Sequence, residues 1–455
     1  MIQESTVLSP TSDKTKTNKV RKEKKNILYC NNIKASTVPL WNFSIKCFHN
    51  QSRYHLYYQS HYIMTTSKSN LFKPIKVGNV TIKHRIAHLP TTRSRATSEH
   101  VPTDLMKTYY TDRAKNGALI ISEATLISLN QGLYPNVPGI FTKQQSQAWK
   151  EIVDSVHSVG GKIAIQLWAL GRVGNAKLLK SHGLPLTGVS PIYEHEKAEK
   201  DAIDAGNPIQ ELTQEQIKDI IYNQYTNAAK LAEEAGFDFI ELHGANGYLI
   251  EQFIHPATNQ RTDKYGGSIE NRSRFLFELI DHLSTVIDPS KLAIRLSPLN
   301  DFQVPEINPT AEEDFTYVLE GLQQRADEGR GLAFIDVVDE RYNPDGTIRP
   351  RTVEFVDKVW KGVLLRGGSF TYDKKGDWST IQKVADADDR TLIGFGRHFI
   401  ANPDLPERIK SGYELNEYDR STFYAGYNYG YNTYPFHGQV LKVDPEEKLA
   451  GVALA

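Results

Sequence analysis

Residues 237–248 read FDFIELHGANGY, a short apolar run that leads directly into a polar stretch with two glycines. The run over 237–242 has the length and composition of a buried strand. His243, Asn246 and Tyr248 follow within six residues, and the small residues between them leave the backbone free to bend. An imidazole, a carboxamide and a phenol in this spacing predict a site that binds an oxygen atom and protonates a neighbouring atom. An ordinary polar loop after a strand is the alternative at this point.

Comparable strand-like runs recur along the chain. They cover residues 85–90, 117–124, 162–168, 237–244, 292–298, 331–339, 362–370 and 390–397. Amphipathic helices are expected between them over 146–159, 213–235, 271–287 and 311–326, the second with Thr213 and Gln216 in capping-box spacing. Apolar strands that alternate with helices form a parallel sheet covered by helices.

Eight such units predict an α/β fold, a closed (β/α)8 (TIM) barrel with loop insertions. A doubly wound open sheet is the structural alternative. Against it, no GxGxxG motif follows the first strand.

The composition excludes several classes of protein. The chain has 455 residues, 39% of them hydrophobic, and no net formal charge, which indicates a large core and argues against a nucleic-acid-binding protein. We find no apolar run long enough to cross a membrane. Both cysteines, Cys30 and Cys47, precede residue 64, so we expect no disulfide and no cysteine-ligated zinc or iron–sulfur cluster in the rest of the chain. No metal cofactor is expected.

The N-terminal segment differs in kind from the rest. Residues 1–63 hold ten Lys/Arg and three Asp/Glu and are rich in Ser, Thr and Asn. We expect a disordered or targeting-like basic extension over 1–63, before a barrel domain over 64–455. Met64 as the usual start is a further interpretation of this segment. The cytoplasm is the expected location, or the mitochondrion if residues 1–63 are a genuine presequence.

Two glycine-containing turns lie at the ends of the seventh and eighth predicted strands. Catalytic groups of such barrels lie at the C-terminal ends of the strands, and the loops after strands 7 and 8 often bind phosphate. Gly368 and Ser369 stand at the C-terminal end of the seventh predicted strand, and Gly396 and Arg397 at that of the eighth. Backbone N–H groups and a guanidinium at these positions predict a site for a phosphate-bearing cofactor, although either turn alone is more often only a turn.

The third and fifth strands carry further polar candidates. Gln166 and Trp168 are two residues apart and share a face, which places a carboxamide beside an aromatic wall. The carboxamide could match the edge of a flavin pyrimidine, whereas core filling is the usual role of a tryptophan. Arg295 needs a counter-charge, for which Glu241 and an anionic reduced flavin are the two candidates.

Several segments, taken in order, resemble the Old Yellow Enzyme family of FMN-dependent ene-reductases. They are 70–79 (NLFKPIKVGN), 84–96, 263–272 (DKYGGSIENR) and 419–424 (DRSTFY), and the resemblance covers residues 70–440. The pair His243 and Asn246, together with Thr92, is similar to the fungal and plant branch of that family. The resemblance implies a barrel that binds FMN non-covalently and takes electrons from NADPH.

It also implies roles for individual residues. The flavin contacts would be Thr92 at the carbonyl of position 4, Pro90 and Thr91 beside it, Ala124, Gln166 at the pyrimidine edge, Arg295 near nitrogen-1, and Gly368, Ser369, Gly396 and Arg397 at the phosphate. Ala124 and Ser369 depart from the family pattern. His243 and Asn246 would bind the substrate oxygen, Tyr248 would donate the proton, and Trp168, Phe302 and Tyr424 would line the substrate pocket.

The implied activity is reduction of the activated C=C bond of α,β-unsaturated aldehydes, ketones and related electron-poor alkenes. The loop 171–211 is expected to cap the barrel mouth, and a homodimer is compatible with the sequence. A specialised relative that reduces or isomerises a biosynthetic enal is one alternative. A glycosidase-like barrel with Glu123 and Glu241 as its carboxylate pair is another, and a non-catalytic flavin-binding protein is the third.

Overall fold

The computed structural model describes residues 68–339, 353–371, 377–440 and 448–455. All of them lie within one compact unit, Arg53–Ala455. The predicted extension over 1–63 lies outside the described residues. Its character, and its boundary with the barrel domain, therefore stay predictions.

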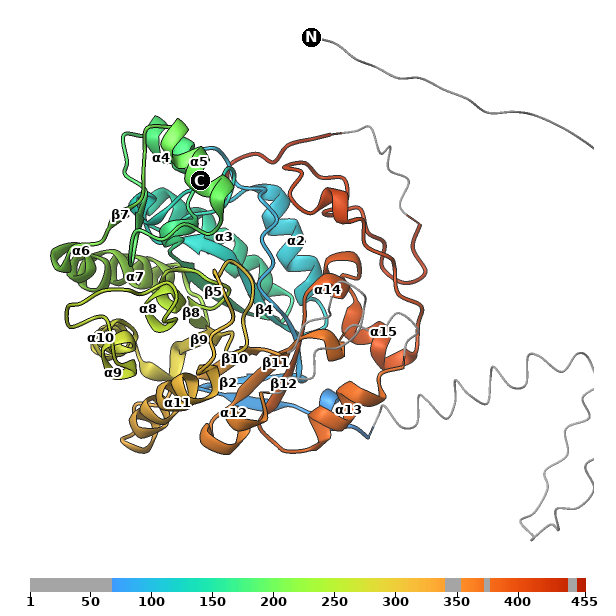
Figure 1. The fold of residues 1–455 in the computed structure, drawn as a ribbon. Helices are drawn as coiled ribbons and strands as arrows, with labels where there is room; N and C mark the ends of the chain where they lie inside the picture. The colour runs from blue at the N-terminus through green and yellow to red at the C-terminus, as the bar shows by residue number, and fades with distance from the viewer. Residues whose placement is uncertain (1–67, 340–352, 372–376, 441–447) are drawn as a thin grey trace, which may run out of the picture. The chain divides into compact units, whose positions relative to one another are not determined.

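The core of the fold is a closed barrel of parallel strands that follow one another around the ring in chain order (Figure 1). The ring closes where the last strand pairs with the first, with Ile393 opposite Ile86. The strands are β3 (Ile86–His88), β4 (Leu119–Leu126), β5 (Lys162–Trp168), β8 (Phe239–Gly244), β9 (Leu292–Leu296), β10 (Phe334–Val338), β11 (Leu364–Gly367) and β12 (Thr391–Phe395). Each predicted strand is confirmed, and the open-sheet alternative is wrong.

Helices surround this barrel (Figure 1). The main ones are α2 (Asp104–Ala114), α3 (Lys143–Ser158), α6 (Gln214–Asp219), α7 (Thr226–Ala235), α9 (Ile269–Arg272), α10 (Arg274–Leu283), α11 (Ala311–Asp327), α12 (Glu354–Val359), α13 (Ser379–Asp386), α14 (Arg397–Ala401) and α15 (Leu405–Ser411). The four predicted helices are confirmed, although the one expected over 213–235 contains a π-helical turn, Ile220–Tyr225. Thr213 and Gln216 form the predicted capping box, and Gly236 ends α7 at φ 88°.

An N-terminal hairpin, β1 (Ile75–Val77) and β2 (Val80–Ile82), was not anticipated from the sequence. Its apolar side chains join a hydrophobic cluster with residues that begin the barrel strands; these include Leu119, Phe239 and Phe334. We call this cluster the basal plug, because it fills the barrel at the N-terminal ends of the strands. A pocket inside the barrel can therefore form only toward the opposite end.

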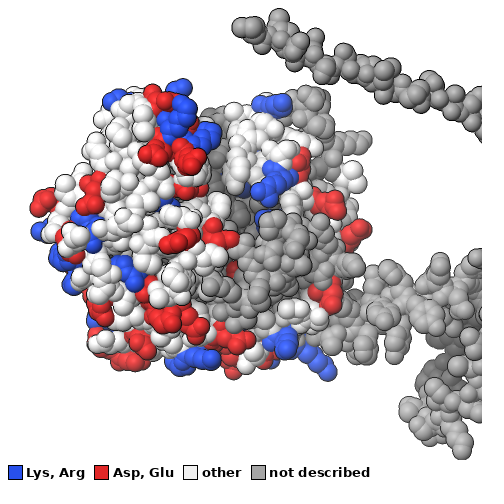
Figure 2. Space-filling view, in the orientation of Figure 1, with Lys and Arg blue, Asp and Glu red and all other residues white. Residues whose placement is uncertain are grey.

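A large insertion lies between β5 and β8, where the sequence predicted the loop 171–211. It contains α4 (Ala176–Ser181), α5 (Glu196–Asp204) and a two-stranded parallel sheet of β6 (Thr187–Gly188) and β7 (Gln210–Glu211). Its apolar residues pack with Trp168 in a cluster separate from the basal plug, which we call the mouth cluster. The surface over α4 and α5 mixes both charge signs, with Lys197–Asp201 and Lys200–Asp204 pairs along α5 (Figure 2).

Arg172 fastens this insertion to the barrel. Its guanidinium donates hydrogen bonds to the carbonyl oxygens of Ile192, within the insertion, and Gln303, in the loop after β9. The side chain is only 3% exposed, so it is a buried link.

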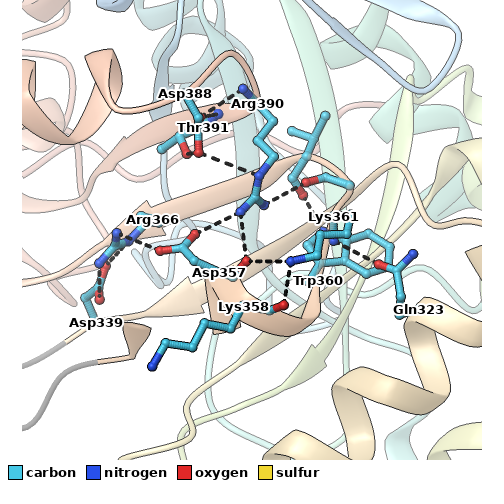
Figure 3. A network of polar contacts seen from close by, with 12 residues as sticks. Gln323, Asp339, Asp357, Lys358, Trp360, Lys361, Arg366, Asp388, Arg390 and Thr391 are labelled. Atoms are coloured by element: carbon cyan, nitrogen blue, oxygen red, sulfur yellow. Dashed lines mark hydrogen bonds and ion pairs between the residues drawn. The ribbon is translucent and has the colours of Figure 1, made fainter. Parts of the chain in front are cut away.

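An ion-pair network ties β10, β11 and β12 to α12 (Figure 3). Arg366 on β11 donates to both oxygens of Asp339, at 2.9 and 3.0 Å, and lies 3.4 Å from Asp357 on α12. Arg390, just before β12, also binds Asp357, at 3.1 Å. Because Arg366 directly precedes Gly367, the network fixes the strand that leads into the predicted phosphate-binding turn.

Candidate active site

The residues Asn246 and Gly247 form a sharp turn at the end of β8. Their φ angles are 59° and 75°, and the Tyr248 N–H donates to the Ala245 carbonyl at 3.3 Å. Two consecutive left-handed residues define a type I′ turn, for which Asn-Gly is the favoured sequence. A side chain at position 247 would also meet the Gln303 carbonyl oxygen at 2.7 Å. The backbone conformation between His243 and Tyr248 therefore requires a sequence such as Asn-Gly at these two positions.

One pocket gathers most of the predicted site residues. It lies at the C-terminal ends of the strands and is lined by Pro90, Thr92, Ala124, Gln166, Trp168, His243, Asn246, Tyr248 and Phe302. These residues come from β4, β5 and β8 and from the segments after β3, β8 and β9. Predicted flavin contacts and predicted substrate contacts thus share one cavity.

Aromatic rings form one wall of the pocket. The Trp168 ring packs edge-to-face on the Tyr248 ring at a centroid distance of 5.0 Å and lies 6.4 Å from the His243 ring. His243 and Tyr248 are themselves 4.8 Å apart. The ring positions of the two predicted catalytic side chains are therefore set by Trp168, which is 1% exposed.

Tyr134 is a site residue that the sequence did not reveal. It packs against Trp168 at 5.5 Å and donates its hydroxyl hydrogen to the Val173 carbonyl at 3.0 Å. Burial, with the neighbouring Tyr248 and Glu194, raises the pKa of Tyr134 above its ordinary value. A single tyrosine in a loop after β4 carries no pattern from which this contact could be predicted.

The environment of His243 fixes its charge. The ring is 5% exposed, and burial followed by the positive charge of Arg295 lowers the pKa of His243 well below its ordinary value. The imidazole is therefore neutral at neutral pH and offers one N–H donor.

Arg295 has a different partner from the one considered above. Its Nη1 binds Asp336 Oδ2 at 2.8 Å, so Glu241 as its counter-charge is wrong. The strand register gives the reason, because Asp336 stands opposite Arg295 whereas Glu241 stands opposite Gln166 and Ala293. Glu241 instead accepts a hydrogen bond from Gln166 Nε2 at 2.7 Å.

Burial raises the pKa of both buried carboxyl groups, but only Glu241 stays protonated at neutral pH, whereas Asp336 is mostly ionised and pairs with Arg295. Burial and Asp336 raise the pKa of Glu241 well above its ordinary value, while burial raises the pKa of Asp336 to about 6 in spite of Arg295. A protonated Glu241 can still accept the hydrogen bond from Gln166 and so orient that carboxamide at the pocket.

Glu123 has a structural position beside the pocket. It lies in a register shift of β4, and its Oε2 accepts the backbone N–H groups of Arg93 at 3.0 Å and Ser94 at 3.1 Å. These contacts hold the segment that carries Thr92. Glu123 and Glu241 are at most 1% exposed and neither lines the pocket, so the glycosidase-like carboxylate pair is wrong.

The pocket end of the barrel is polar in a way that fits a flavin. Within the described ranges, buried atoms without a hydrogen-bond partner include Thr91 Oγ1, Trp168 Nε1, Glu241 Oε2, His243 Nδ1, Arg295 Nε and Asp336 Oδ1. Buried polar atoms in folded proteins nearly always have partners. A flat ligand with donors and acceptors along its edge, such as the FMN ring system, would supply them.

The predicted phosphate residues follow neighbouring strands. Ser369 is buried and begins a short 3-10 turn after β11, while Arg397 is exposed at the start of α14 after β12. The strands β11 and β12 are paired, so the two turns leave the same edge of the barrel. Phosphate binding by Gly368, Ser369, Gly396 and Arg397 stays a prediction.

Tyr424 differs from the other predicted substrate residues. It is 69% exposed and does not line the pocket, whereas Phe302 lines it and is 48% exposed. Contact of Tyr424 with substrate stays a prediction.

Comparisons with known proteins agree with this geometry. Residues 70–416 match the profile of the NADH:flavin oxidoreductase / NADH oxidase family. The fold superposes on the crystal structure of Old Yellow Enzyme from Pichia sp. AKU4542 with a TM-score of 0.80 and 43% identity, over 85% of this chain and 99% of that one. The chain belongs to the Old Yellow Enzyme family.

Two curated members of this Old Yellow Enzyme group are similar over most of their length. A probable NADPH dehydrogenase of Candida albicans is 48% identical over 373 residues, which are 80% of this chain and 91% of that protein. Enoate reductase 1 of Kluyveromyces lactis is 39% identical over 386 residues, 82% of this chain and 95% of that protein.

As a member of the Old Yellow Enzyme family, the chain is an FMN-dependent oxidoreductase. The predicted family, fold, enzyme class and flavin cofactor with a nicotinamide reductant are confirmed. Among the helices in the described ranges, none combines the length and the apolar character needed to cross a bilayer.

Proposed function

We propose that this enzyme uses NADPH to reduce the activated C=C bond of α,β-unsaturated aldehydes, ketones and related electron-poor alkenes. The observation that carries the proposal is the shared pocket, in which His243, Asn246 and Tyr248 stand with Gln166 and Trp168. The names of the relatives, an NADPH dehydrogenase and an enoate reductase, support it.

The flavin would be held by groups that the structure already orients. Thr92 and Gln166 line the pocket, and Gln166 is fixed by Glu241. Arg295, fixed by Asp336, would contribute positive charge near the ring, and the turns after β11 and β12 would hold the phosphate. When bound and reduced, FMN supplies the hydride that the β-carbon of the alkene accepts.

His243 and Asn246 would bind the carbonyl oxygen of the substrate. The neutral imidazole and the carboxamide can each donate one hydrogen bond to that oxygen. Negative charge develops on the oxygen as the β-carbon is reduced, and donors already in place stabilise it without reorganising. This pair therefore lowers the barrier and selects substrates with an oxygen conjugated to the alkene.

Tyr248 would deliver the proton to the α-carbon. A phenol, with an ordinary pKa of about 10, stays protonated at neutral pH and suits a carbanion-like acceptor. Its ring is held in place by Trp168. A proton donor in the pocket favours net reduction over isomerisation of an enal.

Anaerobic stopped-flow absorbance tests the proposal by separating the two half-reactions. NADPH should bleach the oxidised flavin, and 2-cyclohexenone should then restore its absorbance much faster than buffer alone does. Protein that cannot be loaded with FMN, or reduced flavin that no member of a panel of enones and enals reoxidises, would overturn the proposal. The second result would leave a non-catalytic flavin-binding protein.

A further inference from the structure

Glu251 is a buried acid that no step of the proposed reaction uses. It lies in the first turn of α8 (Leu249–Ile254) and is 1% exposed. Its Oε2 accepts three hydrogen bonds: from the Gly247 N–H at 2.6 Å, the Ser297 hydroxyl at 3.0 Å and Asn300 Nδ2 at 3.3 Å. One carboxylate oxygen thus collects donors from the catalytic turn and from the segment after β9.

Ser297 extends this contact to the other turn residue. Its oxygen accepts the backbone N–H of Asn246 at 2.8 Å while its hydroxyl hydrogen goes to Glu251. Both backbone N–H groups of the Asn-Gly turn are therefore linked to Glu251 by hydrogen bonds, that of Gly247 directly and that of Asn246 through Ser297. The Asn246 N–H can only donate and Glu251 Oε2 is already an acceptor for the Gly247 N–H, which fixes the direction of the Asn246–Ser297–Glu251 chain.

The carbonyl groups of the turn are held from the other side. Gln303 Nε2 donates to the Asn246 carbonyl at 2.7 Å, and Gln252 Nε2 donates to the Gly247 carbonyl at 2.7 Å. These two amides hold the carbonyl side of the turn, and Glu251 holds its N–H side. A turn with two left-handed residues needs such support, since a left-handed non-glycine residue is held in place only by its surroundings.

We propose that Glu251 is a positioning residue for the reaction. Its carboxyl group fixes the conformation of the Asn246–Gly247 turn, so that the Asn246 carboxamide and the Tyr248 phenol can contact the same substrate molecule. This inference rests on the proposed function of those two residues. Glu251 does not line the pocket, so its effect passes through the backbone of the turn.

The test compares Glu251→Leu, which keeps a side chain of similar length but no acceptor, with Glu251→Gln, whose amide oxygen can replace Oε2. In each FMN-loaded variant we would measure the dissociation constant of 4-hydroxybenzaldehyde by flavin absorbance and the rate of flavin reoxidation by 2-cyclohexenone. Leaving the three donors without an acceptor should weaken phenol binding about tenfold and slow reoxidation about tenfold. Glu251→Gln should recover both to within about threefold.

Two further variants separate positioning from stability. Ser297→Ala removes the Asn246–Ser297–Glu251 link but keeps the direct contact between Glu251 and the Gly247 N–H. It should weaken phenol binding about threefold to tenfold even if Glu251→Leu does not fold. Asp314→Asn is the matched control, because Asp314 is a buried acid (4% exposed) paired with Arg272 away from the turn. It should lower the melting temperature without changing phenol affinity or the reoxidation rate.

The outcomes distinguish the two levels of the inference. If Glu251→Leu and Ser297→Ala lose melting temperature but keep wild-type phenol affinity and reoxidation, Glu251 is only structural and the positioning role is refuted. Adding Glu251→Leu to Asn246→Ala should cause no further loss of phenol affinity, and a full additional tenfold loss would refute action through the turn. A wild-type enzyme that binds no phenol and is reoxidised by no enone would refute the proposed function itself.

Discussion

Replacing Tyr248 by Phe removes one hydroxyl from the pocket and leaves the ring. The ring contacts with Trp168 at 5.0 Å and His243 at 4.8 Å are kept. Only the polar contacts of the hydroxyl group are lost. We expect the oxidative half-reaction with an enone to slow greatly, while flavin reduction by NADPH, which needs no proton from Tyr248, stays within about twofold of wild type.

The expected sizes follow from these contacts. A positioned general acid contributes about 10²- to 10⁴-fold, or roughly 2.7–5.5 kcal/mol at about 1.36 kcal/mol per tenfold. One lost hydrogen bond accounts for about 1 kcal/mol, or about fivefold. The free energy of unfolding should therefore fall by about 1 kcal/mol only, while reoxidation slows by at least about a hundredfold.

Single-turnover stopped-flow with 2-cyclohexenone measures the two rates separately, and urea unfolding measures the stability. Tyr225→Phe is the matched control, since Tyr225 is fully buried in the π-helical turn and lies outside the pocket. It should change neither rate. Equal slowing of both half-reactions by Tyr248→Phe, or a loss in reoxidation below about fivefold, would refute its role as proton donor.

Four more expectations concern neighbouring groups. His243→Ala should weaken phenol binding about tenfold, and in the wild type that binding should show no imidazole titration between about pH 6 and 8, because the pKa of His243 is well below its ordinary value. Asp336→Asn leaves Arg295 buried without its partner and should cost about 3–5 kcal/mol in urea unfolding. Gly247→Ala places a methyl group 2.7 Å from the Gln303 carbonyl oxygen, at a φ angle of 75°. It should abolish enone reduction while the protein still binds FMN. Burial lowers the pKa of His88 to about 3, so between about pH 6.5 and pH 3 only the unfolded chain takes up that proton. The free energy of unfolding therefore decreases as the pH falls through this range, and His88→Phe should make that decrease less steep.

The barrel was predictable because its signals are local. Each strand is an apolar run bounded by helix or turn residues, and β5 has the predicted bounds, Lys162–Trp168. The hairpin β1–β2 was not predicted, because three-residue strands are too short for periodicity to appear. The π-helical turn inside 213–235 also leaves no sequence signal, since it changes the hydrogen bonding and not the apolar pattern.

The site shows the same division. The His243–Tyr248 motif could be predicted because its chemistry is contiguous in sequence. The partner of Arg295 could not, since the choice between Glu241 and Asp336 depends on strand register. An acid inside the apolar strand Phe334–Val338 was the available signal for Asp336. Tyr134 and Glu251 act through contacts that only the folded chain brings together.

The basal plug and the mouth cluster share no residue, and both are separate from the larger apolar cluster that contains the helix residues Trp149, Leu279 and Phe315. Substitutions in groups without common neighbours have nearly additive effects on stability. A stabilising change in the plug would therefore offset a destabilising exchange around Trp168, whichever exchange is chosen. To change the alkene specificity, stabilising substitutions could first be made in the basal plug, and residues of the mouth cluster could then be varied in that more stable protein.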